Sequence, residues 1–139
     1  MSERQSEARL PLAEAPAEGA VRMLDIGPRR VGLYRVGGAL HALADRCPHR
    51  GAPLCSGMVA TPVRASSPGG LRGTGGEVAL GQRNSTVRCP WHKWEFDIAS
   101  GRCLVDERLR VRRYAVRVED DEIVVTLQPA RAAAIPASR

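Results

Sequence analysis

Short runs in which apolar and polar residues alternate, separated by turn-forming residues, make up the middle and the end of the chain. Such an alternation places every second side chain on the same face of a β-strand. Residues 20–26, 30–36 and 39–45 are three of these runs, and Gly37 and Gly38 separate the last two. Adjacent glycines accept the positive φ angles of tight turns, so the second and third runs predict a β-hairpin.

The same pattern returns in the second half of the chain. Residues 77–80 and 86–89 are short strand candidates, and residues 94–105 predict a hairpin. Two further runs follow at 111–118 and 123–127. We expect no helix longer than a turn or two. About eight short strands with regular turns predict an all-β fold, either a sandwich or a barrel.

Composition divides the chain into one domain with two tails. Residues 1–19 are rich in Ala, Glu and Pro and predict a disordered N-terminal tail, while residues 128–139 predict a C-terminal tail. The region between them, 20–127, has the ordinary size of a single domain. Within it, Gly, Pro and Ser dominate an insert at about 59–86, which we expect to be largely irregular.

Charge and hydropathy limit the possible partners. The 139-residue chain has a formal net charge of +6, and almost all of its cations are arginines. The arginines are scattered, and without a basic tract interleaved with aromatic residues we expect no nucleic-acid partner. No apolar run approaches about 18 residues, so we expect no membrane partner. The N-terminus lacks the apolar core of a signal peptide, which favours a cytoplasmic location.

Two short segments contain the candidate chemistry. Cys47 and His49 are separated by one residue, Cys89 and His92 by two, and 39 residues lie between His49 and Cys89. Two thiolates and two imidazoles suit a [2Fe–2S] cluster with cysteine on one iron and histidine on the other. A structural zinc site is the alternative, but zinc patterns usually keep the two cysteines together and the two histidines together. Each segment here mixes the two ligand types, which favours an iron–sulfur cluster.

The sequences CPHRGAPL at 47–54 and CPWHKWEFD at 89–97 resemble the cluster-binding loops of the Rieske family. The resemblance implies an antiparallel β-sandwich or barrel with a small cluster-binding subdomain, here about 46–97. It also implies one [2Fe–2S] cluster per chain, whose ligands would be Cys47, His49, Cys89 and His92.

Rieske proteins of the respiratory-complex type have an additional cysteine in each loop, and these two form a disulfide. Trp91 occupies that position in the second loop, so the resemblance is to ferredoxin-type and oxygenase-type members. Cys55 and Cys103 are interpreted as ordinary thiols, with a disulfide between them as the alternative. High-potential members have serine and tyrosine hydroxyls where this chain has Trp94 and Phe96. Without those donors we expect a midpoint of about −150 mV rather than about +300 mV.

The small number of histidines limits the function. Only His41 lies outside the two motifs, whereas a Rieske oxygenase also needs a mononuclear iron, usually held by two histidines and a carboxylate. The sequence therefore predicts no catalytic residues and no complete oxygenase. We expect a non-catalytic electron-transfer component that carries single electrons from a reductase to an oxygenase or another terminal redox enzyme.

Two other functions remain open at this point. The chain also resembles the small subunit of NAD(P)H nitrite reductase, in which this fold is an accessory part of a larger enzyme, and a non-redox metal-binding module is the third interpretation. Arg46, Arg50 and Lys93 flank the expected ligands. We expect them to attract an acidic redox partner, the alternative being a generally basic surface.

Overall fold

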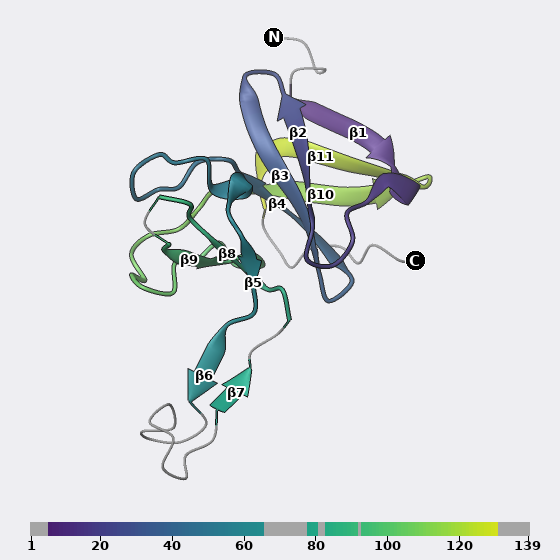
Figure 1. Cartoon of the computed structure of the whole chain (residues 1–139). Helices are drawn as coiled ribbons and strands as arrows, with labels where there is room; N and C mark the ends of the chain where they lie inside the picture. Colours follow the sequence, from purple (N-terminus) through teal and green to yellow (C-terminus); the bar gives the residue numbers. More distant parts are fainter. Residues whose placement is uncertain (1–5, 66–77, 81–82, 92, 131–139) are drawn as a thin grey trace.

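The computed structural model describes residues 6–65, 78–80, 83–91 and 93–130 of the chain. Nearly all the regular structure in these ranges is β-sheet, which confirms the all-β prediction (Figure 1). A six-stranded antiparallel sheet has the order β1-β11-β10-β4-β3-β2. Its strands are β1 (Glu7–Pro11), β2 (Val21–Ile26), β3 (Arg29–Val36), β4 (Ala39–Ala44), β10 (Arg113–Glu119) and β11 (Glu122–Pro129).

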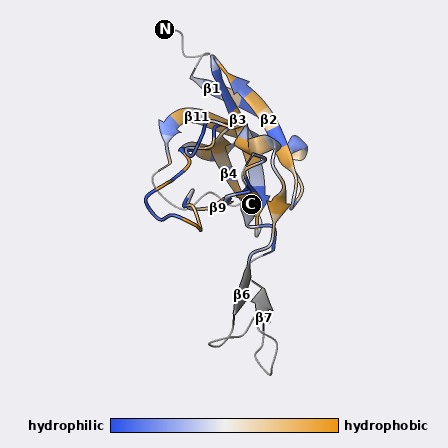
Figure 2. Ribbon diagram, turned by 60° about the vertical axis from the view of Figure 1, so that its left-hand side comes forward, coloured by the Kyte–Doolittle hydropathy of each residue, from blue (hydrophilic) through white to orange (hydrophobic). Residues whose placement is uncertain are grey.

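The large sheet curves into an almost closed barrel, so that its two edge strands, β1 and β2, contact each other. The hairpin of β3 and β4 turns at Gly37 and Gly38, whose φ angles are 58° and 83°, as the paired glycines predict. Apolar and polar segments alternate along β2 (Figure 2). The inner faces of the strands form an apolar core of Leu10, Ile26, Val31, Leu33, Leu40, Ala42, Tyr114, Ile123 and Val125.

The prediction of a disordered tail over residues 1–19 is wrong from residue 7 onward. Residues 7–11 form β1, which pairs with β11, and a 3-10 helix, η2 (Leu12–Glu14), follows. Leu10 pairs with Ile123 and is only 5% exposed. The high Ala, Glu and Pro content of the whole segment predicted disorder, although Leu10 is buried in the barrel core. No helix in the described part of the chain is long and apolar enough to cross a membrane.

The smaller sheet lies next to the barrel and has the order β5-β8-β9. Regular structure extends into both ends of the insert predicted to be irregular, since β5 pairs with β8 and β6 with β7. Residues 66–77 and 81–82 lie outside the described residues. The strands are β5 (Val59–Ala60), β6 (Val63–Ala65), β7 (Val78–Leu80), β8 (Thr86–Arg88) and β9 (Glu95–Asp97).

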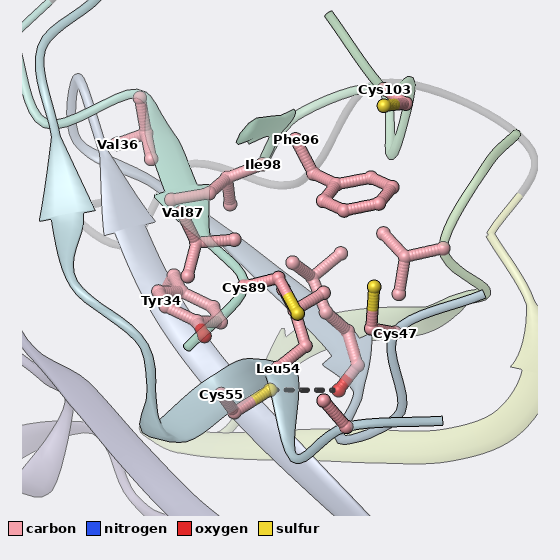
Figure 3. Close-up of a cluster of buried hydrophobic side chains, with 13 residues drawn as sticks. Tyr34, Val36, Cys47, Leu54, Cys55, Val87, Cys89, Phe96, Ile98 and Cys103 are labelled. Atoms are coloured by element: carbon pink, nitrogen blue, oxygen red, sulfur yellow. Dashed lines mark hydrogen bonds between the residues drawn. The ribbon is translucent and has the colours of Figure 1, made fainter. Parts of the chain in front are cut away.

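A second apolar core joins the smaller sheet to the barrel (Figure 3). Tyr34, Val36 and Leu43 extend into it from the barrel strands, and Val87 and Phe96 from the smaller sheet. The hairpin predicted for 94–105 forms only in part, because after β9 the return chain makes just the isolated bridges Phe96–Cys103 and Arg102–Arg110. All four cysteines of the chain belong to this core.

Candidate metal centre

The first of the two loops expected to bind the cluster follows β4 and ends at the short 3-10 helix η3 (Leu54–Ser56). Cys47 begins the loop and is completely buried. Its backbone N–H donates to Ala52 O at 2.8 Å, and its carbonyl accepts from Gly51 N at 2.7 Å. These two bonds close the loop on itself and hold the residues between them, His49 included, in a tight turn.

The second loop repeats this arrangement between β8 and β9. The Cys89 N–H donates to Trp94 O at 2.7 Å, and its carbonyl accepts from Lys93 N at 2.8 Å. Each bond joins the same relative positions as in the first loop, the cysteine with the fourth and fifth residues after it. The chain therefore presents its two cysteines on two backbone turns of the same type.

A left-handed residue closes each turn, four positions after the cysteine. In the first loop this residue is Gly51, with a φ of 78°, and in the second it is Lys93, with a φ of 62°. Only glycine adopts such angles without strain, so Lys93 occupies a position that favours glycine. The sequence analysis considered only the charge of Lys93 and missed its left-handed backbone. The available signal was that Lys93 follows Cys89 by four residues, as Gly51 follows Cys47.

The two cysteine side chains meet inside the second core. Cys47 and Cys89 are both fully buried and lie side by side (Figure 3). Burial raises the pKa of the Cys47 thiol, and the neighbouring Cys89 thiol raises it further. The backbone N–H groups of His49 and Arg50 point at the Cys47 sulfur and lower its pKa, because they stabilise a thiolate. Donors to sulfur are what a thiolate ligand of a cluster needs.

His49 contacts the second loop across the site. Its imidazole stacks on the Trp94 ring with a centroid distance of 3.8 Å and an interplanar angle of 18°. Its Nδ1 atom is shielded from solvent. Phe96 is fully buried in the core. The side chains at the two positions where high-potential members have hydroxyls are thus engaged in packing.

Three of the four expected ligands lie in the described residues. The structure brings Cys47 and Cys89 together, and it places His49 against Trp94 of the second loop. His92, the fourth, lies outside the described residues. Within the described ranges no set of three His, Cys, Asp or Glu side chains is grouped closely enough to hold a single metal ion. Two neighbouring buried thiols, N–H donors to the Cys47 sulfur and a shielded His49 nitrogen nevertheless suit the mixed ligand set of a [2Fe–2S] cluster.

A close backbone contact fixes the two loops relative to each other. Gly57, just after the first loop, lies against the carbonyl of Arg88, the residue before Cys89; a Cβ at position 57 would be 1.7 Å from that oxygen. The Arg88 N–H in turn donates to Met58 O at 2.9 Å. Only glycine allows this approach, so Gly57 is a site-supporting residue that sequence reasoning missed.

The other two cysteines are buried thiols outside the ligand set. The Cys55 N–H donates to Asp45 Oδ1 at 2.8 Å, and its thiol lies 3.7 Å from Leu43 O. Burial, together with the nearby Asp45 carboxylate, raises the pKa of Cys55 to about 12. Cys103 packs in the same core and is 1% exposed.

Comparison with known proteins identifies the family. The model of the Rieske [2Fe-2S] domain matches residues 9–115 of the chain. The chain belongs to the Rieske [2Fe-2S] domain family. This confirms the resemblance seen in the two loops. Members of this family bind one [2Fe–2S] cluster, as the sequence predicts.

Relatives of two kinds are similar to this chain in sequence. Apoptosis-inducing factor 3 of Homo sapiens is 30% identical over 108 residues, which is 77% of this chain but only 14% of that protein. The 3-phenylpropionate/cinnamic acid dioxygenase ferredoxin subunit of Escherichia coli (strain K12) is 27% identical over 122 residues, covering 87% of this chain and 92% of the relative. The ferredoxin of carbazole 1,9a-dioxygenase from Nocardioides aromaticivorans IC177 shares the fold, with a TM-score of 0.61, 23% identity and coverage of 88% and 99%.

Proposed function

We propose that this Rieske protein is a ferredoxin that carries single electrons from a reductase to an oxygenase. The observation that carries this proposal is that Cys47 and Cys89 lie together in a buried core. Two loops with the same hydrogen-bonding pattern bring them there. Similarity to dioxygenase ferredoxin subunits over nearly their whole length supports the same function.

We further propose that Cys47, Cys89, His49 and His92 hold the cluster. A bound [2Fe–2S] cluster supplies a single-electron couple. The thiolates would hold one iron from the buried side, where the N–H groups of His49 and Arg50 stabilise negative charge on sulfur. The imidazoles would hold the other iron, and their neutrality raises the potential above that of an all-cysteine site. Trp94 keeps the His49 ring in orientation by stacking on it.

The side chains around the loops suit an acidic partner. Arg46, Arg50 and Lys93 are exposed beside the two turns. We propose that they attract the donor or the acceptor, which would raise the association rate at low ionic strength. A cytoplasmic location is proposed with this function, because a reducing compartment keeps Cys55 and Cys103 as thiols.

The experiment is anaerobic reconstitution followed by visible absorption, EPR and metal analysis. We expect two irons per chain, the EPR signal of a reduced Rieske cluster, and a midpoint of about −150 mV. Cys89→Ser should lose the cluster. Cys103→Ser, a matched change of a buried cysteine in the same core, should keep it. A colourless protein with stoichiometric zinc would overturn the cluster, and a clearly positive midpoint would overturn the low-potential assignment.

Electron transfer itself needs a second measurement. The reduced spectrum should form with NADH and a catalytic amount of a ferredoxin reductase from a dioxygenase system, and it should decay when the matching oxygenase and its substrate are added. A cluster that forms, yet is neither reduced by the reductase nor oxidised by the oxygenase, would refute the carrier function.

A further inference from the structure

A hollow of about 560 Å³ lies beside the first cluster-binding loop and outside the ligand set. Pro48 and Gly51 of that loop form part of its wall. The rest of the wall comes from the turn between β2 and β3 with the start of β3, the end of β4 with the two residues after it, and the segment that leads into β10. The lining residues that matter here are Arg29, Arg30, Asp45, Arg46, Arg110 and Arg112.

Positive charge in this hollow is largely uncompensated. Five arginines line it, and Asp45 is the one acidic residue among the lining residues. Arg30 is 3.9 Å from Asp45 Oδ2, and none of the other four forms an ion pair with a carboxylate in the described ranges. The Asp45 side chain is only 9% exposed, and its Oδ1 already accepts from the Cys55 N–H. It therefore has little capacity to neutralise further arginines.

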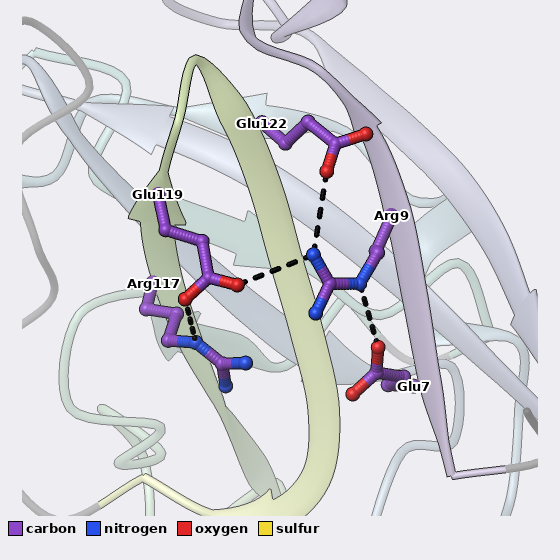
Figure 4. Close-up of polar contacts among 5 residues, drawn as sticks. All are labelled: Glu7, Arg9, Arg117, Glu119 and Glu122. Carbon is purple, nitrogen blue, oxygen red and sulfur yellow. Dashed lines mark hydrogen bonds and ion pairs between the residues drawn. The ribbon is translucent and has the colours of Figure 1, made fainter. Parts of the chain in front are cut away.

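Some arginines on another surface of the protein are paired with carboxylates. On the barrel, Arg9 contacts Glu7 at 2.8 Å, Glu119 at 3.2 Å and Glu122 at 3.3 Å, and Arg117 contacts Glu119 at 3.1 Å (Figure 4). Carboxylates thus satisfy the arginines of that surface from within the chain. Four of the five arginines in the hollow lack such a carboxylate in the described part of the chain.

The arrangement favours an extended acidic ligand over a small anion. All five arginines are exposed, and they come from three separate segments of the chain. A small-molecule site usually encloses most of its ligand and offers buried polar groups that fix its orientation. Exposed arginines on separate segments instead suit a peptide with several carboxylates spaced along it. Each carboxylate can form a bidentate pair with one guanidinium group.

We propose that this hollow binds an acidic segment of the redox partner, a stretch with several Asp or Glu side chains that docks beside the first loop. This inference rests on the proposed carrier function and adds a second contact area to it, on the flank of the loop that contains His49. Because Pro48 and Gly51 belong to both the wall and the loop, a docked segment would bring its protein next to the cluster ligands.

The test measures binding of a fluorescein-labelled hexaglutamate peptide to the reconstituted protein, by fluorescence anisotropy at low ionic strength. In the variant Arg110→Gln with Arg112→Gln, we expect the dissociation constant to rise at least tenfold. The control is Arg22→Gln with Arg117→Gln, which removes the same charge from two exposed arginines outside the hollow. We expect less than a threefold change there. Equal weakening in the two double variants would mean attraction by net charge alone and would overturn the site.

A competitor and a substitute variant complete the binding experiment. Sodium pyrophosphate is added as a competitor, and displacement of the peptide at micromolar pyrophosphate would overturn the peptide assignment in favour of a small anion. Arg29→Gln, a single change at the exposed first residue of β3, replaces the double variant if that variant does not fold. The visible spectrum before and after dithionite separates the two proposals. A normal, reducible cluster with unchanged peptide binding refutes only the docking site, whereas absence of any cluster refutes the carrier function.

Discussion

Because the two loops contain the same type of turn, we predict opposite changes in stability at two equivalent positions. Gly51 and Lys93 occupy the same place in the two turns, with φ angles of 78° and 62°. Adding a Cβ at the first position should destabilise the protein, and removing the Cβ at the second should stabilise it. The three variants are Gly51→Ala, Lys93→Gly and Lys93→Ala, the last being the control that removes the lysine charge but keeps the Cβ.

The magnitude follows from backbone strain, because the surroundings offer little resistance. A Cβ at position 51 would meet the Arg46 guanidinium at 3.4 Å, an ordinary contact with the flexible end of a side chain. A left-handed residue with a Cβ costs about 1–2 kcal/mol, and the greater freedom of glycine in the unfolded chain offsets about 0.4–1 kcal/mol of this. We therefore expect Gly51→Ala to lose about 0.5–1 kcal/mol and Lys93→Gly to exceed Lys93→Ala by the same amount.

Thermal unfolding of the reconstituted proteins, followed by far-UV circular dichroism at one scan rate, measures the effect. For a domain of this size the expected shifts are about 2–4 °C in each direction. Visible absorption recorded in the same scan shows whether the cluster is lost at the same temperature. Lys93→Gly melting at or below Lys93→Ala, or Gly51→Ala melting with the wild type, would show that the two turns are not equivalent.

Three other predictions follow from single contacts. Gly57→Ala should destabilise the protein by about 3 kcal/mol in denaturant unfolding, because the new Cβ meets the Arg88 carbonyl; a loss under about 1 kcal/mol would mean that the two backbones can separate easily. Burial, reinforced by Arg113, lowers the pKa of His41, so the free energy of unfolding should fall as pH drops below about 6.5, where the unfolded chain takes up the proton. His41→Gln should flatten that fall, and an identical slope in both proteins would contradict it. With its pKa raised to about 12, Cys55 should resist iodoacetamide at pH 8 in the folded, cluster-loaded protein and react after unfolding, as mass spectrometry would show; rapid modification before unfolding would disprove its inert state.

Local signals predicted the parts of the fold that depend on neighbouring residues. The paired glycines at 37 and 38 marked the β3–β4 hairpin correctly, because a two-residue turn is specified by its own residues. Strand β1 was missed, since Leu10 is buried only through pairing with β11 more than a hundred residues away. Average composition could not reveal that pairing.

The candidate site also has a part that the sequence predicted and a part that it did not. The cysteine and histidine spacing was sufficient to predict the cluster chemistry, because ligand types and intervals are read directly along the chain. The supporting contacts were not predictable, since they join separate segments. Gly57 becomes essential only when the backbone at Arg88 lies against it. The arginine-lined hollow likewise combines side chains from residues 29 to 112, which appear scattered in the sequence.

The pairing of β5 with β8 has a consequence for how this protein can be changed. Val59 lies opposite Val87 and Ala60 opposite Thr86, so the chain departs from the smaller sheet and rejoins it at adjacent points. Within this span β6 pairs with β7, and lengthening or shortening the peptide that connects these two strands alters the entropy of loop closure by only about 0.6 kcal/mol for each doubling of length. Evolution can lengthen or trim that connection while the two cysteine loops stay the same, and a protein engineer can splice a tag or a second module there.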